Sequence, residues 1–285
     1  SSNKIDWARI VPFVMLHLSC LLVFIVGVSK VAIIIALTLY WARIFSIGAF
    51  YHRYFSHRTF KTNRAWQFIF AVLGASSAQR GPIWWAAHHR HHHQVTDTEK
   101  DPHSPWSQSF WKSHLGWFLT SKNFHYDKNK VKDLLKFPEL CWIDRYDVIV
   151  PILLMIILYL IGETLKVYDP GLKCTGAQLI IWGFSISTVA TLHTTVSINS
   201  FGHKYGTKRY KTGDQSRNNF LLALLTFGEG WHNNHHRYPA TARQGFHWWE
   251  IDITYYILIA MEKMKIIKDL KRVPKHIIEE KQKDG

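Results

Sequence analysis

The amino-acid sequence predicts an all-α membrane protein in which four transmembrane helices form two hairpins, joined to a cytosolic helical cap with interfacial amphipathic helices. Three observations predict this fold class. Long uncharged apolar segments alternate with basic segments rich in His and Trp, although the mean hydropathy of the 285 residues is near zero. Lysine and arginine outnumber aspartate and glutamate by 35 to 20. The 18 histidines gather mainly in clusters that follow apolar segments.

The first hairpin is expected from residues 11–28 and 31–50. Residues 11–28 carry no charge, and residues 31–50 carry only Arg43. Each segment is close to the roughly 20 residues that a helix needs to cross the hydrocarbon core of a bilayer. Only Ser29 and Lys30 separate the two segments, so we expect a tight turn between antiparallel spans.

The second hairpin is expected from residues 148–162 and 179–198, joined by a polar stretch around Asp169. The segment 148–162 is short and contains Pro151. A buried helix of a soluble protein is therefore the alternative for this segment.

The charges near the span ends predict which side of the membrane the cap occupies. Four spans place both termini on one side. The basic residues on that side are Arg53, Arg58, Arg145, Lys204, Lys208 and Arg209, whereas the hairpin turns hold Lys30, Lys166 and Lys173, partly offset by Glu163 and Asp169. Because cytoplasmic segments carry the excess of lysine and arginine, we expect the termini, the cap and the active site in the cytoplasm. The net charge of +15 is then expected to face anionic lipids and not nucleic acid.

We expect a single domain over residues 1–285. Its cap is expected to comprise residues 51–147 and 199–270, followed by a charged tail over 271–285. Two apolar segments of the cap, 66–78 and 248–264, are too short or too charged to span a membrane. Helices lying in the membrane interface and helices packed on the cap are both compatible with them. From Lys265 onward the charges alternate in sign, which predicts a solvated helix followed by disorder.

Nine histidines are candidate metal ligands because of where and how they are spaced. They are His52, His57, His89, His92, His93, His203, His232, His235 and His236. The two triplets that begin at His89 and His232 have i, i+3, i+4 spacing, which puts each triplet on one helix face. Asn199 and His203 lie one helical turn apart.

His52 and His57 are spaced differently, because they are five residues apart. This spacing corresponds to about 140° around a regular helix. Either the helix therefore ends between these two histidines or each serves a different metal.

The number of imidazoles predicts two metal ions, because one transition-metal ion accepts about four to six ligands. Imidazole suits iron, zinc, copper and nickel, so the ligand type does not name the metal. The three cysteines form no CxxC pair, which argues against a thiolate site. We expect His88, His91 and His103 to orient ligands, and His17, His114, His125, His193, His247 and His276 to be structural or exposed.

The motifs HRYFSH (His52 to His57), HHRHHH (His88 to His93) and GEGWHNNHH (Gly228 to His236) resemble the three histidine boxes of membrane fatty-acid desaturases. The resemblance runs from about Trp41 to Ile266 and is closest to the Δ9 acyl-CoA branch, in a bacterial-like form. GEGWHNNHHRYP and DPHSP are specific to that branch, whereas the box spacing is shared with membrane hydroxylases.

The resemblance implies four transmembrane helices under a cytosolic cap that holds two iron ions. Its nine ligand histidines fall on the nine candidates above, and an asparagine that reaches one iron through water falls on Asn199. Zinc is implied as an inactive substitute. The implied reaction uses dioxygen and two external electrons to place a double bond, at Δ9, in a saturated long-chain acyl group.

Two positions leave the acyl carrier open. Animal acyl-CoA desaturases have an arginine two residues before the first ligand of the second box and a basic pair after the following GW, whereas this chain has Ala87 and Ser121-Lys122. Fewer cationic contacts should weaken the binding of a phosphate-rich head. Coenzyme A, a membrane glycerolipid and an acyl carrier protein therefore stay open as carriers.

The sequence also predicts a separate electron donor, because it contains neither the HPGG motif of cytochrome b5 nor CxxC pairs. An acidic ferredoxin or cytochrome b5 would suit the basic cap. The alternatives to a desaturase are a membrane hydroxylase on the same scaffold and, more remotely, a metal transporter. Transport fits poorly because the candidate ligands lie beyond the apolar segments and not within them.

Overall fold

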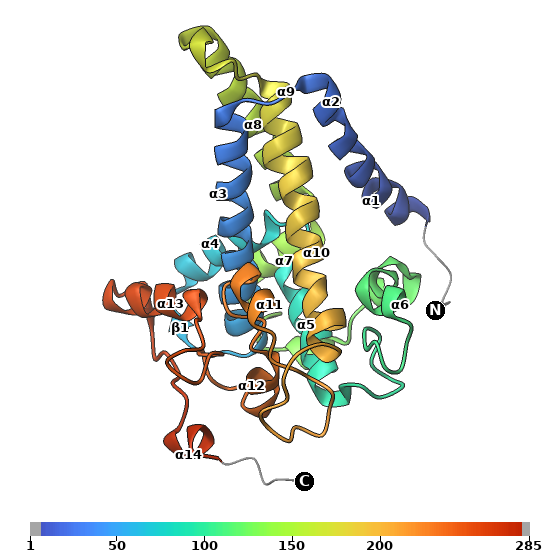
Figure 1. Ribbon diagram of the computed structural model, residues 1–285, viewed down its shortest axis with the longest axis vertical. Helices are drawn as coiled ribbons and strands as arrows, with labels where there is room; N and C mark the ends of the chain where they lie inside the picture. The colour runs from blue at the N-terminus through green and yellow to red at the C-terminus, as the bar shows by residue number, and fades with distance from the viewer. Residues whose placement is uncertain (1–6, 281–285) are drawn as a thin grey trace.

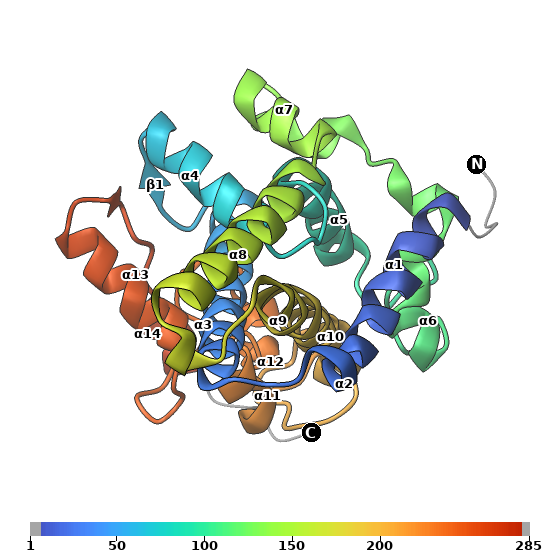
Figure 2. The same ribbon diagram turned by 90° about the horizontal axis from the view of Figure 1, so that it is seen from above.

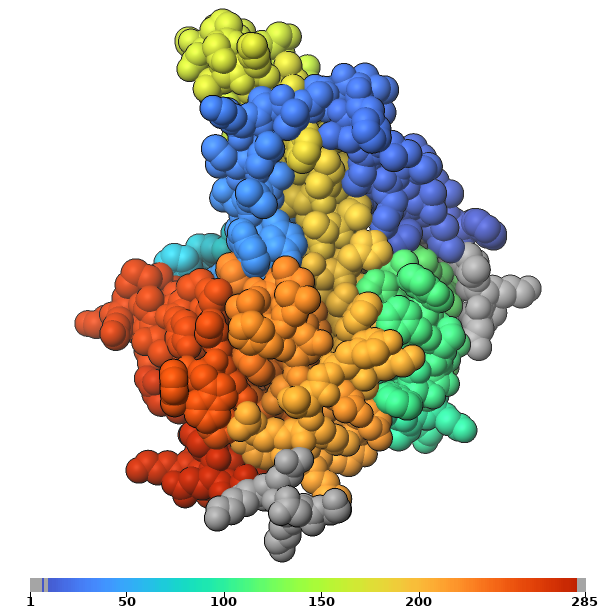
Figure 3. Space-filling view, viewed as in Figure 1, coloured from blue at the N-terminus to red at the C-terminus, as the bar shows by residue number. Residues whose placement is uncertain are grey.

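Long apolar helices form one end of the molecule, and shorter helices and loops form a wider cap at the other end (Figures 1 and 3). This arrangement is seen in a computed structural model that describes residues 7–280. The long-helix end contains α1 (Trp7–Ser19), η1 (Cys20–Leu22), α2 (Val23–Val26), α3 (Lys30–Ser46), η2 (Ile47–Ser56), α8 (Ile149–Tyr168), η6 (Pro170–Leu172), α9 (Gly176–Leu179), η7 (Ile180–Ile186), α10 (Ser187–Ser200) and η8 (Phe201–His203).

The cap is built from the segments that lie between and after these helices. Its elements are β1 (Lys61–Thr62), α4 (Arg64–Ala75), α5 (Pro82–Val95), α6 (Phe110–His114), η3 (Gly116–Leu119), η4 (Ser121–Phe124), η5 (Lys128–Val131), α7 (Pro138–Arg145), α11 (Phe220–Leu225), α12 (His232–Arg237), α13 (Ile253–Lys263), β2 (Ile267–Lys268) and α14 (Lys275–Ile278). The protein is therefore mostly helical, and the two short strands form one antiparallel pair.

Within residues 7–280, three helices are long and apolar enough to cross a membrane, and they cover three of the four predicted spans. They are Lys30–Ser56, Ile149–Tyr168 and Gly176–His203. The second of them extends past the predicted end at Gly162. Glu163 lies inside this helix, and its carboxylate accepts a hydrogen bond from the Gly176 amide at 3.0 Å.

The helix α8 is not the buried helix of a soluble protein. Only 17% of its apolar window is buried, and Ile152, Leu153, Ile156 and Ile157 are all exposed. A soluble protein rarely leaves so continuous an apolar face in water. The exposed face of α8 therefore fits contact with lipid.

The first predicted span, residues 11–28, forms a shorter apolar helix over Ile10–Val26. A 3-10 turn interrupts it at Cys20–Leu22, and it ends at Gly27, whose φ is 70°. Side chains from the neighbouring helix hold this end: Gln178 Nε2 donates to Val26 O at 2.9 Å, and Trp182 Nε1 donates to Gly27 O at 2.9 Å. A membrane span over residues 11–28 therefore stays a prediction.

Arg43 joins the long helix Lys30–Ser56 to the long helix Gly176–His203, and Figure 2 shows α3, α9 and α10 side by side. Its side chain is 1% exposed and donates to Thr188 Oγ1, Ser187 Oγ and Gly183 O. Gly183 lies in η7, a π-helical segment of the kind that loosens regular backbone pairing. Arg43, the only charged residue of residues 31–50, is thus buried and hydrogen-bonded between two apolar helices.

The two short apolar segments of the cap form α4 and α13, and α4 is compatible with both alternatives. One face of α4 packs Phe70 and Ala71 into the main core, whereas Phe68, Ile69 and Leu73 on the other face are exposed. An amphipathic helix of this kind can pack on the cap and lie in the membrane interface at once.

The segment after Lys265 does not form the solvated helix that its charges predict. Ile267 pairs with Thr62 in the strand pair, and Ile277 packs against Tyr210 and Phe246. Counting charges missed the apolar residues Ile267, Leu270 and Ile277, which are all buried. Residues 281–285 of the predicted tail lie outside the described residues.

We expect Gly162→Val to destabilise the packing of α8 on α9. A Cβ at Gly162 would lie 2.5 Å from both Cα and N of Gly176, and backbone atoms cannot move aside cheaply. Overpacking of this kind costs about 1–3 kcal/mol. The thermal unfolding midpoint in detergent should fall, whereas Gly116→Ala, whose nearest neighbour would be 3.4 Å away, should leave it unchanged. Equal midpoints for both variants would show that the contact is not close.

Candidate metal centre

The π-helix η2 explains how two histidines five residues apart can act together. The His57 amide donates to the His52 carbonyl at 3.2 Å, an i to i+5 bond that widens the helix turn. Such a turn brings positions five apart onto one face, whereas a regular helix separates them. The helix ends at Ser56, just before His57, and both histidines belong to one group.

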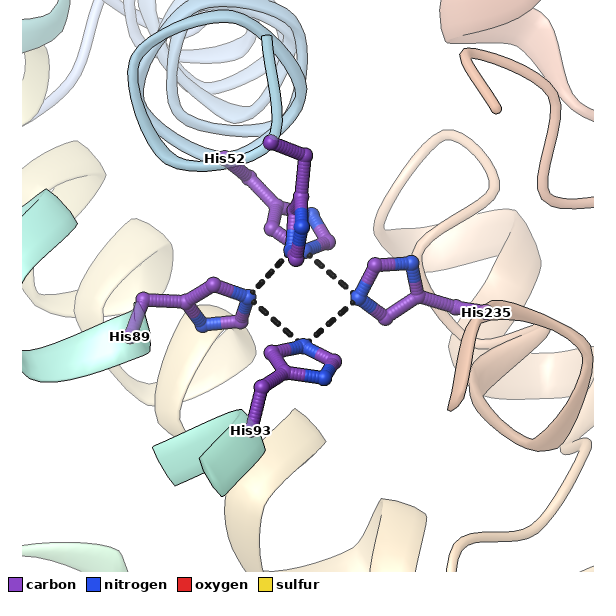
Figure 4. A group of neighbouring side chains, drawn as sticks. His52, His89, His93 and His235 are labelled. Atoms are coloured by element: carbon purple, nitrogen blue, oxygen red, sulfur yellow. Dashed lines mark hydrogen bonds between the residues drawn. The ribbon is translucent and has the colours of Figure 1, made fainter. Parts of the chain in front are cut away.

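The first group of histidines lies where η2, α5 and α12 meet. It contains His52, His57, His89, His93 and His235, whose donor nitrogens all lie within 4.8 Å of one another. Neighbouring Nε2 atoms are 2.8 Å apart between His57 and His89, 3.0 Å between His89 and His93, and 2.9 Å between His93 and His235. Figure 4 shows four of these rings turned toward a common point. We call this set the five-histidine group.

The second group contains His92, His203, His232 and His236, and we call it the four-histidine group. The Nε2 atoms of His203 and His232 are 2.9 Å apart. The triplets of α5 and α12 each serve both groups, because His89, His93 and His235 turn to the first group and the remaining members turn to the second. Asn199 lies one turn before His203, in the last turn of α10.

Four carboxylates that were not predicted from the sequence contact Nδ1 of four of the histidines. Asp101 lies 2.9 Å from Nδ1 of His92, Asp97 lies 3.0 Å from Nδ1 of His203, Asp214 lies 2.9 Å from Nδ1 of His236, and Glu229 contacts Nδ1 of His52. Asp97 and Asp101 follow the second box within nine residues of His92, and Glu229 lies inside the third box motif. Their proximity to the boxes in sequence could have identified these three carboxylates as partners of the histidines.

The environment of Glu229 keeps its carboxylate ionised. Burial alone would raise the pKa of Glu229, but His52 and the Arg53 guanidinium more than offset it and lower the pKa to about 2. Arg53 is itself buried, and it also pairs with Asp252 at 2.9 Å. An ionised carboxylate behind an imidazole fixes which ring nitrogen carries the proton.

The nitrogens that face each group suit a cation. Because Nδ1–H of His92, His203 and His236 donates to a carboxylate, Nε2 of each neutral ring presents a lone pair. Nε2 of His92 and His236 is buried and has no hydrogen-bond partner in the part of the chain that the structure describes. Buried acceptors that face one another without a donor are costly, and a metal ion at their centre would satisfy them.

The remaining histidines divide into those near the groups and those apart. Nδ1 of His103 lies 3.3 Å from Asp101, and the His88 ring contacts the Trp84 ring at a centroid separation of 4.4 Å, tilted by 50°. Away from the groups, His193 joins His17 and His114 in a hydrogen-bonded series, with nitrogen separations of 3.0 and 3.1 Å. The sequence contained no spacing signal for this series, because its members lie on three separate elements.

Acid should destabilise the metal-free protein. Burial first, and neighbouring imidazoles second, hold the pKa values of His57, His89, His93, His235 and His236 well below the ordinary 6.5. The unfolded chain therefore binds more protons than the folded chain once the pH falls below about 6.5, and folding stability falls with it.

The measurement is the unfolding midpoint of chelator-treated protein between about pH 8 and pH 5. We expect a fall that begins near the ordinary histidine pKa, and a shallower fall for His236→Gln. The exposed His276 provides the control, since His276→Gln should keep the original slope. A midpoint that does not change over this range would contradict the burial argument.

Comparison with known proteins shows the family to which this chain belongs. A family model for fatty acid desaturases matches residues 29–265. Acyl-CoA 5-desaturase AL21 of Anemone leveillei is 36% identical over 85% of this chain and 72% of its own length. The sn-1 stearoyl-lipid 9-desaturase of Anabaena variabilis is 33% identical over 95% of this chain and 96% of its own, and delta-9 acyl-lipid desaturase 1 of Arabidopsis thaliana is 34% identical over 94% and 84%. The chain thus belongs to the fatty acid desaturase family, as an oxidoreductase that acts on acyl chains.

Proposed function

We propose that this protein is a membrane desaturase that uses dioxygen and two external electrons to form a double bond in a saturated acyl chain. The observation that carries the proposal is the division of nine buried or half-buried histidines into two groups, each able to hold one ion. The ligands would be the five-histidine group at one position and the four-histidine group at the other. Asn199 would contribute to the second position through a water molecule.

Iron is the metal that suits both the donor set and the chemistry. Imidazole nitrogen binds iron and zinc alike, but zinc has no redox chemistry and would give an inactive protein. When bound, two irons would supply the oxidising power that removes two hydrogens from neighbouring methylenes, and these two hydrogens together with dioxygen, two electrons and two protons would give two waters.

The protein's own residues would hold and shield that centre. Trp85 stacks on the His89 ring, with a centroid separation of 5.1 Å, and lies 6.0 Å from the His52 ring. Trp84 and Trp117 are buried and stack on each other nearby, whereas Trp106 and Trp111 are exposed. The three inner tryptophans would exclude water from the histidine groups, and the two outer ones suit a membrane interface.

For the substrate, we favour a saturated long-chain acyl group carried on a membrane glycerolipid and desaturated at Δ9. The relatives from Anabaena variabilis and Arabidopsis thaliana, which align over nearly all of this chain, are named as stearoyl-lipid and acyl-lipid 9-desaturases. Ala87 is 1% exposed and offers no charge for a coenzyme A head. Coenzyme A and acyl carrier protein are the competing carriers, and product analysis distinguishes them.

For the topology, we propose four spans, with both termini and the histidine groups on the cytoplasmic side. The helix over Ile10–Val26 would be the first span, and the three longer apolar helices would be the others. The cap over residues 51–147 and 199–270 then forms one domain with the spans. The basic residues near the span ends support this orientation.

The direct test is expression in a host that lacks its own desaturase, with iron and an electron donor supplied. We expect new lipids that carry one double bond, detected by mass spectrometry with the bond located chemically. The lipid class that gains the double bond first identifies the acyl carrier. His235→Ala should abolish the product, because it removes one member of the five-histidine group.

The matched control is His125→Ala, since His125 is exposed and belongs to neither group. It should keep full product formation and the same membrane insertion. A hydroxylated chain without an alkene would replace the desaturase proposal with a hydroxylase. Metal accumulation without any dioxygen-dependent product would point to transport.

We further propose that a separate acidic electron donor, a ferredoxin or cytochrome b5, docks at a shallow groove on the cap. The groove is lined by Ser56, His57, Arg58, Arg90, Pro239, Ala240 and Lys271. It combines three basic side chains with His57 of the five-histidine group. Charge complementarity of this kind raises the association rate of an acidic partner.

Reduction by an acidic ferredoxin should therefore slow as ionic strength rises. Lys271→Glu should slow reduction at low salt, whereas Lys173→Glu, in the turn between α8 and α9, should not. Stopped-flow reduction kinetics measure both effects. Rates that do not depend on salt, or equal losses in both variants, would rule out electrostatic docking at this groove.

A further inference from the structure

The two histidine groups differ in how many carboxylates support them. In the four-histidine group, His92, His203 and His236 each donate Nδ1–H to an aspartate, at 2.9, 3.0 and 2.9 Å. In the five-histidine group, His52 alone has such a contact among the described residues, to Glu229. Three of four imidazoles are therefore carboxylate-backed at one position, against one of five at the other.

The charges of these carboxylates are also balanced differently. Glu229 shares the Arg53 guanidinium with Asp252, at 2.8 and 2.9 Å, so its negative charge is partly offset at the five-histidine group. Asp97 instead accepts hydrogen bonds from the Ser104 hydroxyl and the Gln215 amide, at 2.6 and 2.7 Å, which carry no formal charge. Asp101 likewise accepts bonds from the amides of Asp97 and His103.

Burial makes this difference matter. Asp97, Asp101 and Asp214 have side chains that are at most 10% exposed, so water screens their charges poorly. A carboxylate behind a metal-bound imidazole also raises the basicity of that ligand. Both effects favour the more highly charged of two metal ions at the four-histidine position.

On the basis of the proposed di-iron function, we propose that the two metal positions are electronically unequal. In the one-electron-reduced protein, the four-histidine position holds Fe³⁺ and the five-histidine position holds Fe²⁺. Asp97, Asp101 and Asp214 are then positioning residues that set which iron stays oxidised. One electron from an external reductant would convert one Fe³⁺ to Fe²⁺, and no covalent bond would form or break.

The location of the surface groove agrees with this order of reduction. His57 is the only member of either group that lines the groove, and it belongs to the five-histidine group. An electron that arrives from a donor at the groove would therefore reach first the position that accepts it more readily.

The test is a stepwise reduction of the iron-loaded protein, enriched in ⁵⁷Fe, with dithionite and a redox mediator. Mössbauer and electron paramagnetic resonance spectra then report the Fe³⁺ and Fe²⁺ populations after each step. We expect two separate steps and a mixed-valent form in the wild type. Asp97→Asn and Asp214→Asn should each bring the steps closer together and lower the yield of the mixed-valent form.

Glu229→Gln is the matched control and should have the opposite effect. It removes the negative charge at the five-histidine group, while Arg53 keeps its ion pair with Asp252, so Fe²⁺ is further favoured there. The two steps should therefore separate more widely. A single two-electron step in the wild type, or the same direction of change in all three variants, would overturn the proposal.

Zinc titration of the metal-free protein supplies a readout without activity or redox chemistry. Asp97→Asn and Asp214→Asn should each weaken one of two zinc equivalents by about 10–100-fold, a loss typical of such supporting groups. The other equivalent should bind as before, which shows that the variants are folded. Equal weakening of both equivalents would contradict unequal positions.

Failure of this inference can be told apart from failure of the proposed function. A protein that desaturates lipids and shows no ordered reduction would keep the function and lose the inference. A protein that binds two metal ions unequally but forms no alkene would keep the charge asymmetry and lose the desaturase proposal.

Discussion

The structure depends on the hydrogen bonds between histidine Nδ1 atoms and buried carboxylates. These bonds hold His52, His92, His203 and His236 in the tautomer that points a lone pair inward. Lone pairs that converge in a buried space repel one another and lack solvent. A bound cation would relieve this cost, and the two histidine groups have the donor atoms to hold one.

The rest of the fold brings these rings together from distant parts of the chain. The helix α5 supplies histidines to both groups, and α12 does the same from the far end of the sequence. The helix α3 continues as the π-helical segment η2, which puts His52 and His57 on one face. Arg43 clamps α3 to the helix that ends at His203, so both helices reach the cap in a fixed relation.

Much of this arrangement followed from the sequence, and what did not follow required contacts between distant residues. Hydropathy located three long helices, and spacing identified the nine histidines that the structure gathers. Periodicity assumed a regular helix and so could not place His52 with His57. The support from Asp214, and the series formed by His17, His193 and His114, join separate elements and have no local signature. The segment after Lys265 was misread because its charges hid three buried apolar side chains.

The most direct measurement is an anomalous difference map from crystals of the iron-loaded protein, recorded on both sides of the iron absorption edge. The account predicts two iron peaks, one among the Nε2 atoms of the five-histidine group and one among those of the four-histidine group. A single peak, or iron bound elsewhere while both groups stay empty, would contradict the central claim that the histidines hold a di-iron centre.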